Sequence, residues 1–112
     1  MNKQRRKELY AIKERLKVIT NTDKENVDLD ETKEILEDIK CDLECLYNDE
    51  ESYMDNIPEN LQESIRYEKA EAACDNLEAA VDSVDDAICS DDFEEMVNAI
   101  EEAINFIDNA TV

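Results

Sequence analysis

Apolar residues recur three and four positions apart along most of this chain of 112 residues. Near the N-terminus the spacing is kept by Leu9, Ile12, Leu16 and Ile19. Residues spaced in this way lie on one face of an α-helix, so the pattern predicts a first helix over about residues 4–20. The chain contains no glycine, which the two-residue turns of β-hairpins favour. The sequence therefore predicts an all-α protein.

A second apolar stripe predicts a long helix over about residues 29–55. Its members are Leu29, Thr32, Leu36, Ile39, Leu43, Leu46 and Tyr53, and Glu50 alone breaks the spacing. This stripe is one residue out of phase with the first, which predicts a break within residues 21–28. A single bent helix is the alternative. Asp28 or Asp30 is placed to cap the second helix, where the helix dipole favours acids.

Pro58 is the only proline in the chain. Proline suits the first turn of a helix because that turn does not use its missing N–H group. The chain should therefore reverse between Tyr53 and Pro58, with Asn56 capping a third helix over about residues 58–89. The apolar stripe of this helix is wide and rich in alanine, which predicts close packing between two neighbouring helices.

A last helix is expected over about residues 91–110, capped by Ser90 or Asp91. Its stripe consists of Phe93, Met96, Val97, Ile100, Ala103, Ile104 and Ile107. Together the patterns predict one domain, residues 1–112. We expect an elongated antiparallel helical hairpin or bundle of about four helices, two long and two shorter. A hairpin that dimerises satisfies the same pattern.

The net charge of −20 is distributed unevenly. Residues 1–17 hold seven bases and two acids, a charge of +5, whereas the rest holds five bases and thirty acids, a charge of −25. No base follows Lys69, although thirteen acids do. Such charge is also typical of disorder, but disordered chains lack apolar stripes. Like charge argues against nucleic acid or an anionic membrane as a direct ligand, so partners should be basic.

The basic first helix has two interpretations. It either packs on the acidic helices and lowers their mutual repulsion, or contacts nucleic acid or a membrane surface. The first interpretation is preferred, because the same molecule carries the −25 charge. The chain has neither a secretory signal nor the roughly 20 consecutive apolar residues of a membrane helix. A cytoplasmic protein with reduced cysteines is therefore expected.

The residues that most catalytic and metal sites require are absent. The chain has no histidine and no glycine, so the commonest general base and the phosphate-binding loops are missing. Cys41 and Cys45 lie one helical turn apart, but a zinc site would need two further thiolate or imidazole ligands. The loop at residues 21–26 resembles a calcium loop only faintly, because Asn26 and Thr32 replace its glycine and glutamate. We expect no enzyme, cofactor or metal site.

Acids form rows along the predicted helices. The row on the third helix is Glu71, Asp75, Glu78, Asp82 and Asp85, extended by Asp86, Asp91, Asp92, Glu94 and Glu95, and a second row is Asp30, Glu34, Glu37, Glu44 and Glu51. Neighbouring acids in a row lie about 5 Å apart along the axis. Duplex DNA carries one charge per roughly 1.7 Å, so several rows side by side would approach its density. A solvated helix face is the alternative, although such faces usually mix in lysine.

The segment NIPENLQESIRYEKAEAACDNLEAAVDSVDDAI, residues 56–88, and the basic head at residues 1–8 resemble small acidic helical proteins of phages and mobile elements of gut Firmicutes. Residues 56–62 are the most specific part, whereas residues 20–50 differ from the shorter relatives. The family has no established function. The resemblance implies a bacterial host and a character similar to inhibitors of host defence, including anti-CRISPR and anti-restriction DNA mimics.

The leading hypothesis is a non-enzymatic inhibitor whose acids occupy the basic nucleic-acid groove of a host defence nuclease. A CRISPR effector is the expected partner, and the third-helix row with its extension, from Glu71 to Glu95, is the expected binding site. The alternative is a helical interaction or assembly protein, homo-oligomeric or bound to a partner helix, with acids that serve only solubility. It would be sensitive to changes at Leu36, Leu43, Leu77 or Ile100. An antitoxin that covers a basic toxin is a third hypothesis.

Overall fold

A computed structural model describes residues 1–61 and 64–111. This part of the chain contains four α-helices, two short 3-10 helices and no strand. The α-helices are α1 (Lys3–Thr20), α2 (Leu29–Asp55), α3 (Ile65–Ile88) and α4 (Phe93–Ala110), and the 3-10 helices are η1 (Lys24–Asn26) and η2 (Glu59–Leu61). The molecule measures 55 × 22 × 18 Å. The prediction of an elongated all-α bundle with two long and two shorter helices is confirmed.

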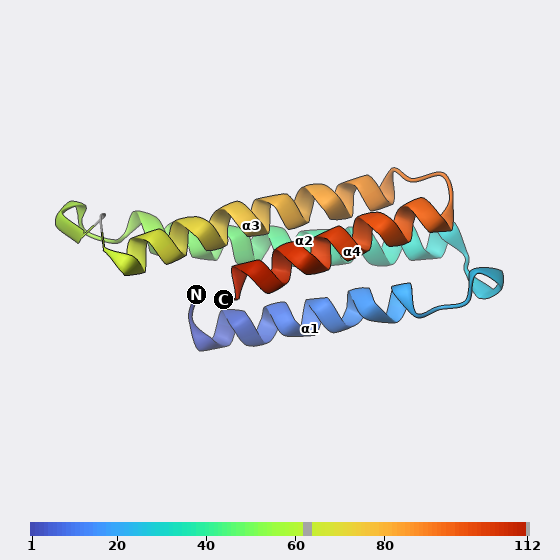
Figure 1. The fold of residues 1–112 in the computed structure, drawn as a ribbon, viewed down its shortest axis with the longest axis horizontal. Coiled ribbons are helices and arrows are strands. Elements are labelled where there is room, and N and C mark those ends of the chain that lie inside the picture. The colour runs from blue at the N-terminus through green and yellow to red at the C-terminus, as the bar shows by residue number, and fades with distance from the viewer. Residues whose placement is uncertain (62–63, 112) are drawn as a thin grey trace.

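Successive helices run in opposite directions, so that the chain forms an antiparallel bundle (Figure 1). The helix α3 packs closely against both α2 and α4, as its wide alanine-rich stripe predicts. The helix α1 contacts α2 and α4 less extensively. The α2–α3 hairpin extends past the first turn of α1 and the last turn of α4, where the two termini lie (Figure 1).

The core of the bundle is formed by one apolar stripe from each helix. The side chains with the least exposure include Leu9, Leu16, Leu36, Ile39, Leu43, Leu77, Val84, Met96, Ile100 and Ile107. Leu36, Leu43, Leu77 and Ile100 are therefore interior residues that stabilise the monomer. Changes at these four residues would therefore act first on the packing of the four helices.

Glu50 occupies a core position and is completely buried. Its Oε2 accepts a hydrogen bond of 2.8 Å from Nε of Arg5, and its Oε1 lies 3.5 Å from the α-ammonium group of Met1. The guanidinium group of Arg5 also lies over the ring of Tyr53, 5.4 Å from its centroid. Glu50, the acid that interrupts the second stripe, thus anchors the start of α1 to α2.

Each α-helix begins with a side-chain cap. Asn2 accepts a hydrogen bond from the Arg5 amide at 2.7 Å, and Asp28 accepts from the amides of Asp30 and Glu31 at 3.0 and 3.2 Å. These bonds satisfy amide groups that have no partner within the helix. Of the two predicted caps for α2, the structure selects Asp28. Residues 21–28 separate α1 from α2, which excludes the single bent helix.

Two predicted helix starts need correction. The helix α3 begins at Ile65 rather than near residue 58, because the hydroxyl group of Ser64 caps it by accepting from the Tyr67 amide at 3.3 Å. Asn56 ends α2 instead of starting α3. Pro58 precedes η2, so the proline rule located the reversal but not its length. Residues 62 and 63, which the predicted third helix included, lie outside the described residues.

The helix α4 begins at Phe93, and its cap is Asp92, whose Oδ1 accepts from the Glu95 amide at 2.8 Å. Neither Ser90 nor Asp91 takes this role. Ser90 is buried and donates its hydroxyl proton to the carbonyl oxygen of Asp86, so its oxygen is directed back toward α3. Across the described residues, no helix is both long and apolar enough to cross a membrane.

Candidate functional site

The predicted acid row of α3 is exposed along its whole length. One hydrogen bond and one electrostatic interaction relate the row to α2. Asp85 accepts a hydrogen bond of 2.9 Å from Nζ of Lys40, and the charge of Glu78 acts on the hydroxyl group of Tyr47. Since the row keeps a spacing of three and four residues, its other members lie on the same flank of α3. The row therefore borders α2.

Three acids of the predicted α2 row line the same border. Glu37 and Glu44 lie one turn to either side of Lys40, and Glu51 accepts a hydrogen bond of 2.7 Å from the Tyr47 hydroxyl group. The antiparallel packing of α2 on α3 thus brings two separate rows together. We call this surface the acidic seam; it consists of Glu37, Glu44 and Glu51 of α2 and Glu71, Asp75, Glu78, Asp82 and Asp85 of α3. Asp30 and Glu34, near the start of α2, are exposed but outside it.

The charges of the acidic seam shift the titration of the groups within and beneath it. The hydrogen bond to Asp85 raises the pKa of Lys40, with further contributions from Glu44 and Glu37. The hydrogen bond to Glu51, burial and the charge of Glu78 raise the pKa of Tyr47 to about 12. In both cases a hydrogen bond to a carboxylate is the largest cause, and the charges of neighbouring acids further favour the protonated form.

Beneath the seam, burial raises the pKa of the Cys74 thiol to about 12, and the carboxylates of Glu50 and Glu51 add to the shift. The sequence pattern did not identify Lys40 and Tyr47 as parts of this surface, or Cys74 as a residue beneath it. The spacing of Lys40 and Tyr47 from Glu37, Glu44 and Glu51 was the available signal, because all five keep the same helical repeat. The sequence does not show that this face of α2 lies beside the acid row of α3, which is what makes it part of the acidic seam.

The remaining predicted site residues do not all join the acidic seam. Asp86 is exposed on α3, and Asp91 lies in the connection to α4. Asp92 is engaged as the cap of α4, where it binds the amide of Glu95. Glu94 lines a hollow together with Thr20 and Lys24, against the end of α1. The row that the sequence extends from α3 to α4 is thus interrupted where the chain turns.

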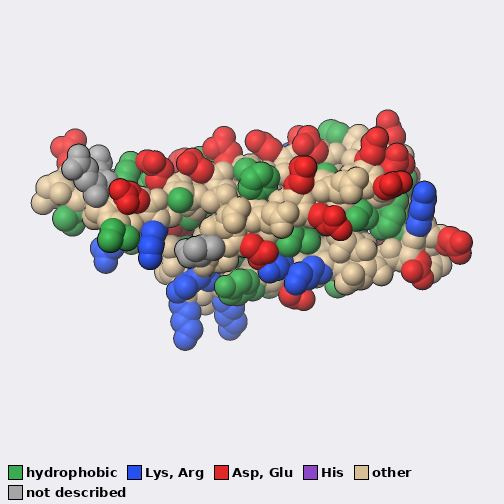
Figure 2. Space-filling view, viewed as in Figure 1, with side chains coloured by type: hydrophobic (Ala, Val, Ile, Leu, Met, Phe, Trp, Pro, Cys, Tyr) green, Lys and Arg blue, Asp and Glu red, His purple; other side chains and the backbone are tan. Residues whose placement is uncertain are grey.

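Three basic residues of α1 form ion pairs with acids of α2 and α4. Arg5 binds Glu50 in the core, Nη1 of Arg15 lies 2.6 Å from Oδ2 of Asp42, and Lys13 binds Asp108 of α4. None of these acids belongs to the acidic seam. In Figure 2 acidic side chains follow the edge formed by α3, whereas basic side chains project from the opposite edge, below α1. The helix α1 packs against the acidic helices, as the preferred interpretation predicts.

The charge density of the acidic seam follows from its geometry. Fifteen residues of helix, from Glu71 to Asp85, span roughly 21 Å, and the α2 acids extend this length slightly. Eight carboxylates and the ammonium group of Lys40 leave about one net charge per 3–4 Å of axis. Duplex DNA carries one charge per roughly 1.7 Å, so the seam reaches about half of that density. In the described ranges, Lys40 is the one cation with an ion pair to a seam acid.

The thiol groups offer no metal centre within residues 1–61 and 64–111. All four cysteines are unpaired; Cys41, Cys45 and Cys89 are exposed, and Cys74 is buried. No three cysteine or carboxylate side chains in these ranges are placed to hold one ion. Comparisons of the chain with protein families, with curated proteins and with solved structures found no match.

Proposed function

We propose that this protein is a non-enzymatic inhibitor that presents the acidic seam to the basic nucleic-acid groove of a host defence nuclease, with a CRISPR effector as the first candidate. The seam carboxylates stand in for phosphate groups. The resemblance of residues 56–88 to small phage proteins motivates the choice of partner. A basic groove is the complementary surface, because opposite potentials steer association and select the partner.

One observation carries the proposal. Two helices hold eight carboxylates in two parallel rows, and a single lysine lies among them. An ordinary solvated face gains from alternating lysine and glutamate, so this arrangement adds repulsion without stabilising the fold. Three bases of α1 bind acids outside the rows, namely Glu50, Asp42 and Asp108, and in the described ranges no base of α1 forms an ion pair with a seam acid.

The proposal is tested by capture of partners from a host lysate, followed by elution on a salt gradient. The triple variant Glu71→Gln, Asp75→Asn and Glu78→Gln should lose capture of the nuclease and the inhibition of its cleavage. A matched control neutralises three exposed acids outside the seam: Glu25, Glu101 and Glu102. The control changes net charge equally and should retain both activities.

Capture of a nuclease that elutes at moderate salt would support the decoy, because exposed charge pairs are screened over about 8–10 Å. Equal loss of inhibition in both triple variants would show that inhibition depends only on net charge. That result would contradict the proposal that the acidic seam is the binding surface. Association that resists salt would favour the alternative, a helical interaction or assembly protein whose acids serve solubility.

A further inference from the structure

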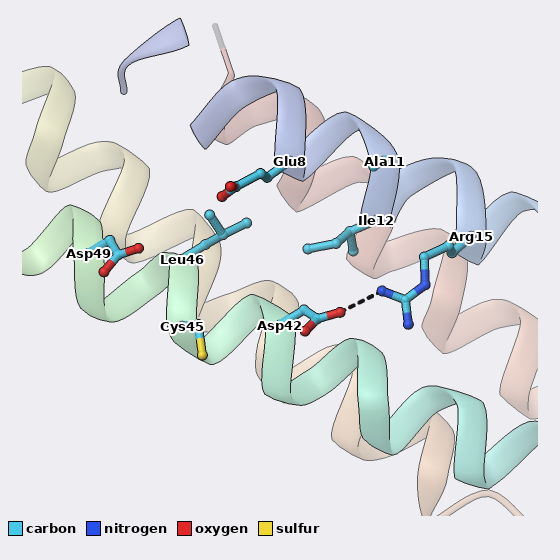
Figure 3. Close-up of a pocket in the computed structure, with 8 residues that line it drawn as sticks. All are labelled: Glu8, Ala11, Ile12, Arg15, Asp42, Cys45, Leu46 and Asp49. Carbon is cyan, nitrogen blue, oxygen red and sulfur yellow. Dashed lines mark hydrogen bonds and ion pairs between the residues drawn. The ribbon is translucent and has the colours of Figure 1, made fainter. Parts of the chain in front are cut away.

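Two hollows lie at the surface between α1 and α2, where the side chains of the two helices do not fill the space. The first, of about 360 Å³, lies between the middle of α1 and the second half of α2. Ile12 and Leu46 form its apolar floor, with Ala11 beside them, and Glu8 and Asp49 stand at one end (Figure 3). The second, of about 210 Å³, lies between the last turn of α1 and the first turns of α2. We call the two hollows together the α1–α2 groove.

Exposed apolar side chains line the second hollow. Val18 of α1 is 68% exposed and Ile35 of α2 is 41% exposed, and both border it together with Val27 and Phe93. Only five large hydrophobic residues are exposed in the described chain, so two of them, from different helices, meet at one site. Exposed apolar side chains that gather in this way mark interaction surfaces more often than scattered ones do.

The borders of the α1–α2 groove are acidic. Glu8, Asp42 and Asp49 border the first hollow, and Asp28 and Glu31 border the second. The only base that lines either hollow is Arg15, and Asp42 already binds its guanidinium group at 2.6 Å (Figure 3). The groove therefore combines an apolar floor with negative borders.

We propose that the α1–α2 groove binds a basic amphipathic helix of a partner protein. Such a helix would place its apolar stripe against Val18, Ile35 and Ile12, and its lysine or arginine side chains beside the acidic borders. Grooves between helices bind amphipathic helices in this way, through apolar anchors three, four and seven residues apart. This inference does not depend on the proposed function, because the groove and the acidic seam lie on opposite flanks of α2.

Charge and size argue against other occupants. Nucleic acid is repelled by the acidic borders, and a second copy of the chain would bring another charge of −20. The first hollow, of about 360 Å³, lies at the lower end of the roughly 300–1,000 Å³ of pockets that enclose small molecules, and the second, of about 210 Å³, is smaller. A helix laid along the groove would use both hollows together, whereas a small molecule would occupy only one of them.

The test uses two labelled synthetic peptides of leucine and lysine with the same composition. One has leucines at helical spacing, and the other is scrambled so that no apolar stripe forms. Fluorescence anisotropy in 150 mM NaCl should give at least about tenfold tighter binding of the striped peptide, because only the stripe buries apolar area in the groove. Equal affinities would show attraction by charge alone and would overturn the proposal.

A double variant separates the groove from charge attraction. Val18→Glu with Ile35→Glu makes the protein more negative, so binding by charge alone would strengthen, whereas binding in the groove should weaken at least about tenfold. The matched control is Leu61→Glu with Ile65→Glu, which makes the same change at exposed apolar residues near the α2–α3 turn. The control should keep the affinity of the unmodified protein.

Two further measurements complete the test. Circular dichroism should show that both double variants stay folded, since all four replaced side chains are exposed and none belongs to the core. Sedimentation should show a monomer. A dimer that Val18→Glu with Ile35→Glu dissociates would identify a second copy as the occupant and overturn the assignment of a basic partner helix.

The triple change in the acidic seam should leave the preference for the striped peptide unchanged, even if it abolishes nuclease inhibition.

Discussion

Arg5 and Glu50 form a buried ion pair, with 2.8 Å between Nε and Oε2, and the carboxylate of Glu50 is completely inaccessible to solvent. Oε1 of Glu50 has no hydrogen-bond partner among the described residues. A buried carboxylate is expensive to desolvate and is stabilised only by its partners. The two members of the pair should therefore respond very differently to substitution.

The first prediction concerns this asymmetry. Arg5→Met should lower the free energy of unfolding by about 3–5 kcal/mol, because it leaves a buried charge with only the more distant Met1 ammonium group. Glu50→Leu should be nearly neutral or stabilising, since it restores the apolar stripe and Arg5 can reach solvent. Urea unfolding at pH 7 measures both. A larger loss for Glu50→Leu than for Arg5→Met would contradict this view of the pair.

A second prediction tests the start of α4. Asp92→Ala should cost about 1 kcal/mol of unfolding free energy, because the Glu95 amide loses its acceptor. The adjacent Asp91→Ala is the control, with the same change in charge and an expected effect within about 0.5 kcal/mol. Thermal unfolding of both variants measures the loss of stability in each. Equal effects would mean that the cap contributes nothing beyond charge.

The third prediction is selective thiol reactivity. Burial raises the pKa of Cys74 to about 12, so at pH 8 its thiol stays protonated and covered. Cys41, Cys45 and Cys89 are exposed and should react. Titration with a chromogenic disulfide reagent should release about three thiol equivalents from the folded protein and a fourth after denaturation. Rapid reaction of the fourth thiol in the folded state would show that α3 opens from α2.

Stability should fall in alkaline solution, which is the fourth prediction. The pKa values of Cys74 and Tyr47 rise on folding from 9.0 and 10.0 to about 12 in each case. Both groups therefore bind their protons more tightly when folded, so their contribution to stability is complete below pH 9 and is lost between pH 9 and 12. The melting temperature should drop over that window. The combined variant Cys74→Ala, Tyr47→Phe should show a shallower decline, and an unchanged slope would assign the effect to other groups.

A fifth prediction concerns the single lysine of the acidic seam. Lys40→Gln removes the cation bound to Asp85 and should increase affinity for a decalysine peptide about two- to threefold at low salt, because one more carboxylate is free. Lys24→Gln changes net charge equally in η1, outside the seam, and serves as the control. Titration by fluorescence at two salt concentrations measures both. Matching effects in the two variants would indicate attraction to net charge rather than to the seam.

Local patterns in the sequence were sufficient to locate the four helices, but not all of their ends. The three- and four-residue spacing located the four helices, and Asp28 was among the predicted caps, because both features depend on neighbours within two helical turns. The start of α3 was misplaced since Pro58 marks a reversal without specifying its length. In the same way, Asp92 rather than Ser90 or Asp91 became the cap of α4 through a choice among adjacent acceptors that spacing does not resolve.

The sequence by itself determined that the chain forms amphipathic helices and that its acids are concentrated after residue 17, because these are properties of single segments. Only the tertiary structure decided which rows meet. Packing of α2 on α3 placed Glu44 and Glu51 beside the α3 row, whereas the turn at Asp91 kept Glu94 away from it. The tertiary structure also explains Glu50, which interrupts the apolar stripe of α2 because it pairs with Arg5 of α1. Contacts between residues 45 positions apart depend on how helices pack, and no local periodicity encodes that.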